Sequence, residues 1–285
     1  MIKYEDLVNK TAETLVNAST IFSPDKIEAY ERAIEAEENP NAKWVLQSII
    51  ENSSVAKEIK FPLCDDTGIP HIFLEIGDSA VLPKGFINAI KEGVKIGLRQ
   101  LPGRPMAVKG NDRERISQCC GLSEDSGDLQ MAPIQIRELK DSDKVLLTVL
   151  MLGGGPEIRG KTLRVFHKHS DEVVINEMVE WAKEGCDKLG CLPAVLGFGI
   201  GRTNLEAASL SLEAMRHGNF LIQSDIEKEI TDKVNESNIG PLGLGGKTTV
   251  LGTFVKVGPQ RASGVRIVSM RVGCCFDPRK ATVIL

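Results

Sequence analysis

The segment AVLGFGIGRTN, residues 194–204, carries the signals that decide the fold class. Ala194–Phe198 is a short apolar run, which is typical of a buried strand. Gly199–Gly201 predicts a turn, and Asn204–Met215 predicts the helix that this turn opens. A strand followed at once by a turn and a helix indicates a mixed α/β chain.

The same mixture extends outward from this segment. Apolar residues recur at helical spacing through residues 1–60, where the last predicted helix covers Pro40–Lys60. Further patterns predict strands at His71–Ile76, Pro133–Leu139, Lys144–Leu152, Thr248–Val257 and Val265–Val272, helices at Pro83–Arg99, Asp171–Lys188 and Asp225–Asn235, and a long irregular connection over 103–130. We therefore predict one α+β domain over residues 1–285: a helical N-terminal region, 1–60, followed by a mixed sheet flanked by helices.

The composition excludes several classes of protein. The chain has 285 residues, of which 42% are hydrophobic and 26% charged, so global disorder is excluded. Lys and Arg number 35 against 39 Asp and Glu, and a net charge of −4 argues against nucleic acid as a partner. The acidic N-terminus lacks a signal-peptide pattern, and the most apolar runs are too short to span a membrane. We expect a cytoplasmic protein that does not associate with membranes.

Seven cysteines leave two interpretations open: Cys64, Cys119, Cys120, Cys186, Cys191, Cys274 and Cys275. An odd number in a chain without a secretion signal argues against a disulfide framework. These residues are then either small buried hydrophobes or metal ligands. Cys64, Cys191 and Cys275 lie at the predicted ends of elements, which favours ligation, but their spacing matches neither ferredoxin nor zinc motifs.

Four loops rich in glycine or acidic residues are candidate anion sites: Cys64–Gly68, Gly153–Gly155, Gly199–Thr203 and Gly243–Thr249. The last loop is not a P-loop, because Pro241 stands where the first glycine of that motif belongs. The adjacent carboxylates Asp65 and Asp66 either belong to a turn or helix cap, or one of them is held protonated as a general acid beside an anionic substrate.

Several motifs occur in a fixed order along the chain: Cys64-Asp65-Asp66-Thr67-Gly68, Leu152–Gly155, Cys191-Leu192-Pro193, Gly199–Thr203, Gly243–Thr248 and Cys275–Lys280. With them the chain resembles the α subunit, or N-terminal domain, of the class I iron–sulfur hydro-lyases. That family contains the class I fumarate hydratases and the L(+)-tartrate dehydratases. The resemblance extends from about residue 5 to the end of the chain.

The resemblance implies an enzyme that hydrates or dehydrates a small hydroxy-dicarboxylate with a [4Fe–4S] cluster. It implies three cluster ligands, Cys64, Cys191 and Cys275, and leaves one iron free to act as a Lewis acid. It makes Asp66 a catalytic residue and gives Arg99 both a catalytic role and the task of clamping a substrate carboxylate. Further substrate contacts are implied at Asp65, Thr67, Gly154, Gly155 and Lys247. A β subunit and an α2β2 or similar assembly are implied as well.

The chain also departs from the family pattern. Asp65 replaces a Gln, Leu152 a Lys and Arg202 a Gly, and Gln260–Ser263 lacks the family's Arg-His pair. Cys274 is an alternative third ligand beside Cys275. These departures support a second hypothesis, a divergent paralogue that serves as a binding or sensing subunit without hydratase activity.

Overall fold

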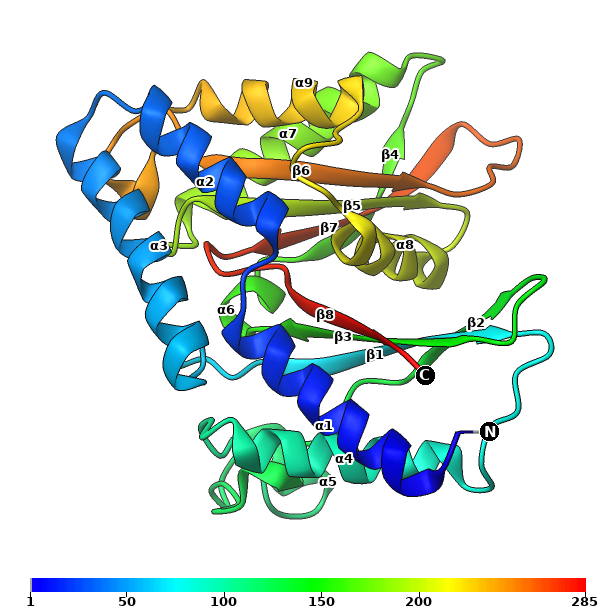
Figure 1. The fold of residues 1–285 in the computed structure, drawn as a ribbon. Helices are drawn as coiled ribbons and strands as arrows, with labels where there is room; N and C mark the ends of the chain where they lie inside the picture. The colour runs from blue at the N-terminus through cyan, green and yellow to red at the C-terminus, as the bar shows by residue number, and fades with distance from the viewer. Residues whose placement is uncertain (1) are drawn as a thin grey trace. The chain divides into compact units, whose positions relative to one another are not determined.

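The computed structural model describes residues 2–285 and contains two compact units (Figure 1). The first unit comprises 2–21, Ser53–Gly153 and Arg279–Leu285, and the second comprises Phe22–Asn52 and Gly154–Pro278. Helix α3 (Pro40–Ile59) contributes its first part to the second unit and its last part to the first. That both units act as one domain over 1–285 stays a prediction.

In the first unit, α1 (Tyr4–Thr20) and α4 (Phe86–Gln100) pack against each other and close a core that includes Leu15, Ile72 and Leu98. The two helices approach closely because α4 presents glycines to α1. A Cβ on Gly93 would lie 2.5 Å from the carbonyl oxygen of Val8, and one on Gly97 3.1 Å from the Cβ of Leu15. No larger residue fits between these helices without moving them.

The first sheet has the strand order β2-β1-β3-β8. Its strands are β1 (Ile69–Gly77), β2 (Gln135–Leu139), β3 (Val145–Leu152) and β8 (Arg279–Ile284). β1 is parallel to β2 and antiparallel to β3, and β3 is antiparallel to β8. Between α4 and β2 the chain forms α5 (Asp112–Ser117) and a 3₁₀ turn, η1 (Ser126–Asp128).

The second sheet has the strand order β4-β7-β5-β6. Its strands are β4 (Lys161–Phe166), β5 (Ala194–Gly201), β6 (Val250–Val257) and β7 (Val265–Gly273). Only β5 and β6 are parallel. The rest of this unit is formed by α2 (Pro24–Ala36), α6 (Gly154–Glu157), α7 (Asp171–Asp187), α8 (Asn204–His217), α9 (Asp225–Asn235) and the 3₁₀ turn η2 (Pro241–Gly243).

The alternation of residues along β5 explains how helices cover both faces of this sheet (Figure 1). Leu196 and Phe198 point into the core that α7 closes. Gly197 and Gly199 point the other way, toward α8, where a Cβ on Gly199 would lie 2.1 Å from the carbonyl oxygen of Ala207. The glycines of this strand therefore allow α8 to pack directly on the sheet backbone.

The α+β class and the helical character of residues 1–60 are confirmed, since α1, α2 and α3 form there. Three expectations were wrong. The strands form two sheets rather than one, since β1, β2, β3 and β8 pair only among themselves and β4 to β7 only among themselves. Within the first sheet, the strands on either side of Lys140–Asp143 each pair with β1 and not with each other. Gly199–Gly201 continues β5 rather than forming a turn, since these residues pair with β7. The patterns also missed β4, β8 and the short helix α5.

Candidate functional site

The loop that contains Cys64 precedes β1 and is anchored at both of its ends. The amide of the buried Leu63 donates a hydrogen bond to the carbonyl oxygen of Ser19 at 2.9 Å. At the other end, Gly68 has φ of +80°, and a Cβ there would lie 2.8 Å from the carbonyl oxygen of Leu152. Cys64, half-buried, places its Sγ 3.6 Å from Asp65 Oδ1. The predicted site residues Cys64 to Thr67 thus lie on one tightly held loop.

Arg279, the first residue of β8, fixes the backbone of this loop. Its side chain is 2% exposed, and its Nη1 donates hydrogen bonds to the carbonyl oxygens of Asp66 at 2.7 Å and Thr67 at 3.2 Å. A buried guanidinium needs such acceptors, because removing a charge from water is costly. Arg279 belongs to the motif Cys275–Lys280, but the motif itself predicted no role for it.

Gly153, at the end of β3, makes room for the side chain of Asp66. A Cβ at Gly153 would lie 2.5 Å from Asp66 Oδ2, whereas a Cβ at Gly155 would meet no atom within 4 Å. The predicted substrate contacts Gly154 and Gly155 are the first two residues of α6, in the second unit. The glycine that the carboxylate of Asp66 approaches is therefore Gly153, which was not among the predicted substrate contacts.

Arg104, which no sequence motif identified, also contacts this loop. Its backbone amide donates to Thr67 Oγ1 at 2.9 Å, and its Nε donates to the carbonyl oxygen of Asp65 at 2.8 Å. Its Nη1 lies 3.6 Å from Asp65 Oδ2, in an ion pair whose partners are both exposed. Arg104 therefore supplies a positive charge beside the carboxylate that replaces the family's Gln. Arg104 lies in segment 103–130, which has no periodic pattern or motif that could have predicted this contact.

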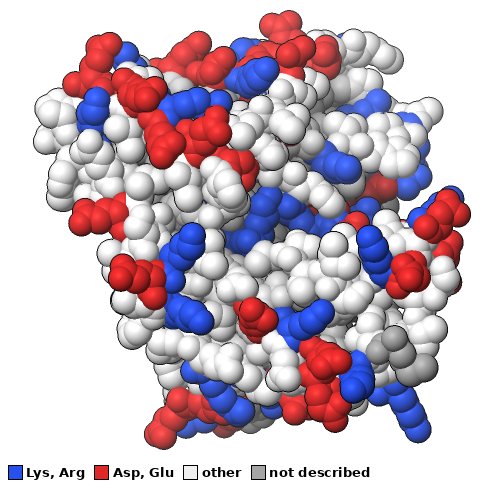
Figure 2. Space-filling model, in the orientation of Figure 1, with Lys and Arg blue, Asp and Glu red and all other residues white. Residues whose placement is uncertain are grey.

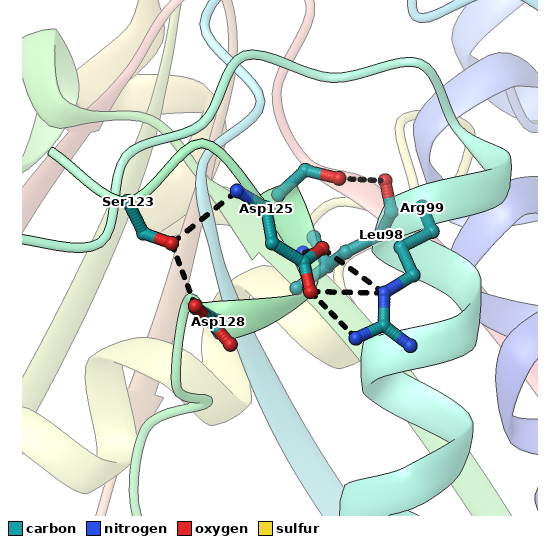
Figure 3. Close-up of polar contacts among 7 residues, drawn as sticks. Leu98, Arg99, Ser123, Asp125 and Asp128 are labelled. Atoms are coloured by element: carbon teal, nitrogen blue, oxygen red, sulfur yellow. Dashed lines mark hydrogen bonds and ion pairs between the residues drawn. The ribbon is translucent and has the colours of Figure 1, made fainter.

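Arg99, the predicted carboxylate clamp, is engaged by Asp125 (Figure 3). Arg99 Nη2 lies 2.6 Å from Asp125 Oδ2, and Arg99 Nε lies 3.0 Å from Asp125 Oδ1. The hydrogen bond from Arg99 lowers the pKa of Asp125 to about 2, and the amide of Gly127 contributes to the same shift. The guanidinium is thus held in a two-pronged contact, the geometry in which Arg binds carboxylates.

In the second unit, Cys191 and Cys275 lie side by side. The amide of Cys275 donates a hydrogen bond to the carbonyl oxygen of Cys191 at 3.0 Å. Cys191 precedes β5 and is exposed, whereas Cys275 follows β7 and is buried. Val195 of β5 pairs with Gly273 of β7, so the antiparallel register brings the two cysteine segments together. Both cysteines lie at element ends, as the sequence predicted.

The contacts around Cys275 shift the pKa of its thiol in opposite directions. A hydrogen bond with Cys274 and burial raise the pKa of Cys275 well above its usual value, whereas the charge of Lys26 lowers it. Asp277 holds the turn, since its Oδ2 accepts from the amide of Cys274 at 3.0 Å. Cys274 belongs to the apolar core of this unit. Cys275 is buried as well, so burial does not choose between the two cysteines, and Cys275 as the third ligand stays a prediction.

Lys247, another predicted substrate contact, lies in a loop that docks on the residues before α3. Its amide donates to Glu37 Oε2 at 2.8 Å, and its Nζ pairs with Glu38 Oε1 at 2.6 Å. Gly246 has φ of +123°, and a Cβ there would lie 2.7 Å from Glu37 Oε2. The glycines of this loop therefore serve a close approach between backbone and carboxylate within the protein.

The remaining cysteines differ in environment. Cys186 belongs to the core of the second unit, where burial raises the pKa of its thiol to about 12, whereas Cys119 and Cys120 are exposed. Across residues 2–285, no group of three or more His, Cys, Asp or Glu side chains is already assembled to hold a metal ion. Cys64 belongs to the first unit, and Cys191 and Cys275 belong to the second.

The surface agrees with the mixed charge of the sequence. On the face drawn in Figure 2, both signs are interspersed, and acidic side chains gather over α2 and α9. Within residues 2–285, no helix has the length and apolar character needed to cross a membrane.

Comparisons with known proteins cover nearly the whole chain. Residues 8–284 match the family described as Fumarate hydratase (Fumerase). A protein of Methanocaldococcus jannaschii, provisionally named L(+)-tartrate dehydratase subunit alpha, is 31% identical over 273 residues, which cover 92% of this chain and 91% of the relative. The L(+)-tartrate dehydratase subunit alpha of Escherichia coli K12 is 24% identical over 294 residues, which cover 99% and 92%.

Proposed function

This chain belongs to the fumarate hydratase (Fumerase) family, and from that premise we propose that it is the alpha subunit of a hydro-lyase acting on a small hydroxy-dicarboxylate of the malate or tartrate type. The observation that carries the proposal is the arrangement at Asp66. Its backbone is fixed by the buried Arg279, and its carboxylate lies against Gly153. The backbone of Asp66 is fixed, and the absence of a Cβ at Gly153 leaves room for its carboxylate. A carboxylate held in this way is suited to transferring a substrate proton.

We propose that Cys64, Cys191 and Cys275 hold a [4Fe–4S] cluster. Two observations fit this donor set. All three lie in loops between helices and strands, and the backbone hydrogen bond from the amide of Cys275 to the carbonyl oxygen of Cys191 holds two of them side by side. Thiolate is the ligand that iron–sulfur clusters take in proteins.

When bound, such a cluster supplies an iron with an open position that acts as a Lewis acid toward the substrate hydroxyl. Asp66 would take the proton from the neighbouring carbon during dehydration and return it during hydration. That carbon acid is weak, so positive charge must stabilise the negative charge that develops on the adjacent carboxylate. Thr67 and the glycines Gly154 and Gly155 would contact the substrate next to this carboxylate.

Arg99 and Lys247 would bind substrate carboxylates in exchange for their present partners, Asp125 and Glu38. Both pairs are substantially exposed, and exposed ion pairs are weak in water, so a dianionic substrate can compete for them. Asp65 would remain beside Arg104, which offsets the charge that this residue adds to the site.

The names of the relatives include the words subunit alpha. We therefore propose a β subunit that completes the active site, in an α2β2 or similar assembly located in the cytoplasm.

The test is anaerobic co-expression of this chain with its β subunit. We expect a brown complex that contains iron and sulfide and dehydrates malate or tartrate. Cys64→Ser, Cys191→Ser and Cys275→Ser should each lose iron, whereas the matched controls Cys119→Ser and Cys120→Ser should retain it. A triple Cys64, Cys191 and Cys275 variant that still assembled the cluster would refute the ligand set.

The same complex decides between the two hypotheses. Turnover of malate, tartrate or a methylated analogue excludes a sensing subunit. A complex that holds a full cluster and binds these acids without turning over any of them would instead favour that alternative.

A further inference from the structure

The second unit contains a hollow at the carboxyl ends of its parallel strands β5 and β6, which we call the β5–β6 hollow. Its volume is about 400 Å³, within the range of about 300–1,000 Å³ that small-molecule sites occupy in proteins. The apolar part of its lining comes mainly from α7, β5 and β6: Val174, Ile175, Met178, Ile200, Val255 and Val257. None of these residues has a part in the proposed function.

Arg266 of β7 brings a positive charge to the β5–β6 hollow. Alternate residues of a strand point to the same face, so Arg266 shares the face of β7 on which Val268 and Met270 enter the core. This apolar face therefore ends in a half-buried guanidinium where the hollow begins. A charge at such a place benefits from a partner, because removing it from water is costly.

The contacts of Arg266 leave much of its guanidinium available. Its Nη1 donates to the carbonyl oxygens of Ser263 at 3.3 Å and Val265 at 3.0 Å, but within residues 2–285 its Nε and Nη2 have no hydrogen-bond partner and no carboxylate pairs with it. Arg202 and Arg271 of the same unit, in contrast, each pair with a glutamate. A carboxylate that entered the hollow would supply the counter-ion through parallel N–H···O hydrogen bonds.

One carbonyl oxygen fixes both Arg266 and the side of the hollow. Besides the bond from Arg266, the carbonyl oxygen of Ser263 accepts from His167 Nε2 at 2.7 Å. His167 Nδ1 accepts from the amide of His169 at 2.9 Å, so the ring hydrogen is on Nε2. Because both ring nitrogens bind within the protein, His167 serves as a wall, whereas Arg266 remains available to a ligand.

The turn beside this wall has a conformation that is unusual for its residues. Lys168 and His169 have φ of 49° and 58°, in the left-handed region. The amide of Ser170 donates to the carbonyl oxygen of His167 at 2.8 Å and closes the turn ahead of α7. Residues other than glycine adopt this conformation at a cost in free energy, and they cluster at binding sites. The turn at the rim of the hollow agrees with a binding role.

We propose that the β5–β6 hollow binds a small organic monocarboxylate with an apolar body, such as a medium-chain fatty acid anion, with its carboxylate on Arg266 and its chain on the apolar side chains of α7, β5 and β6. An uncharged apolar molecule would leave Arg266 without a counter-ion, and an inorganic anion would leave the apolar walls uncovered. The exposed Asp171 also borders the hollow and repels a second negative charge, which disfavours dicarboxylates.

The experiment is isothermal titration calorimetry of straight-chain ligands into the full-length chain and into the αβ complex. From butanoate to octanoate, affinity should rise by up to about fourfold for each methylene that becomes buried. 1-Octanol lacks the carboxylate, and octanedioate adds a second one. Both should bind about tenfold more weakly than octanoate, since a hydrogen bond between charged groups contributes at least this factor.

Variants assign the charge and the wall separately. Arg266→Met should lower the affinity for octanoate about tenfold and leave that for 1-octanol nearly unchanged. Its control is Arg164→Met, which removes an exposed arginine of β4 that lies over the ring of Phe166. Val257→Ser should weaken octanoate several-fold more than butanoate. Its control is Val81→Ser in the first unit, because Val257 is 55% exposed and Val81 60%.

The outcomes are decisive. The absence of saturable octanoate binding, equal affinities for octanoate and 1-octanol, or an Arg266→Met variant that binds octanoate like the wild type overturns the inference. Binding by the chain but not by the αβ complex would show that the β subunit covers the hollow, and would overturn it as a site for a free ligand. Where Arg266→Met fails to fold, the comparison of octanoate with 1-octanol and the Val257→Ser variant decide. Neither measurement depends on the cluster, so the result is independent of the proposed function.

Discussion

The guanidinium of Arg279 lies 2.7 Å from the carbonyl oxygen of Asp66, 213 positions away in the sequence. Through this hydrogen bond, β8 fixes the backbone position of Asp66, whose side chain is the candidate catalytic carboxylate. The same guanidinium reaches the carbonyl oxygen of Thr67. Two backbone acceptors of the loop therefore depend on one buried side chain.

We expect Arg279→Met to lower the free energy of unfolding by about 3 kcal/mol, since a hydrogen bond to a charged group contributes about 1.5–3 kcal/mol and the buried carbonyls would lose their donor. Urea denaturation of the full-length chain measures this. The control is Arg202→Met, which removes an arginine paired with Glu206 near the surface. Equal losses in the two variants would contradict the role of Arg279.

Gly153→Ala should reduce kcat of the αβ complex on the order of 100-fold, because a new Cβ would lie 2.5 Å from Asp66 Oδ2 and displace the carboxylate. The control is Gly264→Ala, where a Cβ meets no atom within 4 Å. Steady-state kinetics with the preferred hydroxy acid gives both values. Normal turnover by Gly153→Ala would show that the catalytic position of the Asp66 carboxylate does not depend on Gly153.

The pair between Arg99 and Asp125 predicts a pH dependence. The pKa of Asp125 is lowered to about 2 in the folded protein, below its ordinary value of about 3.9. Its contribution to stability is therefore present above about pH 4 and is lost as the pH falls through about 2. Arg99→Gln should raise the midpoint of the Asp125 carboxyl in a ¹³C NMR titration toward the ordinary value.

Glu206 is the control for this titration, because Arg202 lowers its pKa to about 2 independently of Arg99. Its midpoint should be the same in the wild type and in Arg99→Gln. If Asp125 titrates alike in both proteins, the pair does not form in solution.

Burial also predicts which thiols react. The pKa of Cys186 is raised to about 12, so only about one molecule in ten thousand carries the thiolate at pH 8. Iodoacetamide should modify the exposed Cys119 and Cys191 of the iron-free chain within minutes and leave Cys186 intact until the chain unfolds. Rapid labelling of Cys186 in the native chain, seen by mass spectrometry, would contradict its burial.

Local patterns were sufficient for much of the fold. Asp225–Asn235 forms the helix that its apolar spacing predicts, and the apolar run at 145–152 forms β3. Pairing was not predictable, because a strand finds its neighbour through contacts far apart in sequence. β8 begins with the buried Arg279 and continues with partly exposed residues, so it lacks the apolar alternation that identifies a strand.

The candidate site was predictable where motifs are contiguous. The loop from Cys64 to Gly68 was found as a unit for that reason. The partners of Arg99 and of Asp65 were not found, since Asp125 and Arg104 lie in an aperiodic segment whose course depends on tertiary contacts. Nor could the sequence alone show that Gly153, rather than Gly154 or Gly155, makes room for Asp66.

The backbone hydrogen bond between Cys275 and Cys191 bears on whether folding precedes the delivery of iron. These residues are 84 positions apart in the sequence, and they become neighbours only when β5 and β7 have paired. Pairing between distant strands is a slow step in folding. Two of the three proposed ligands are therefore presented together late in biogenesis, so iron delivered to the nascent chain would meet isolated thiols, whereas iron delivered after folding would meet a prepared pair.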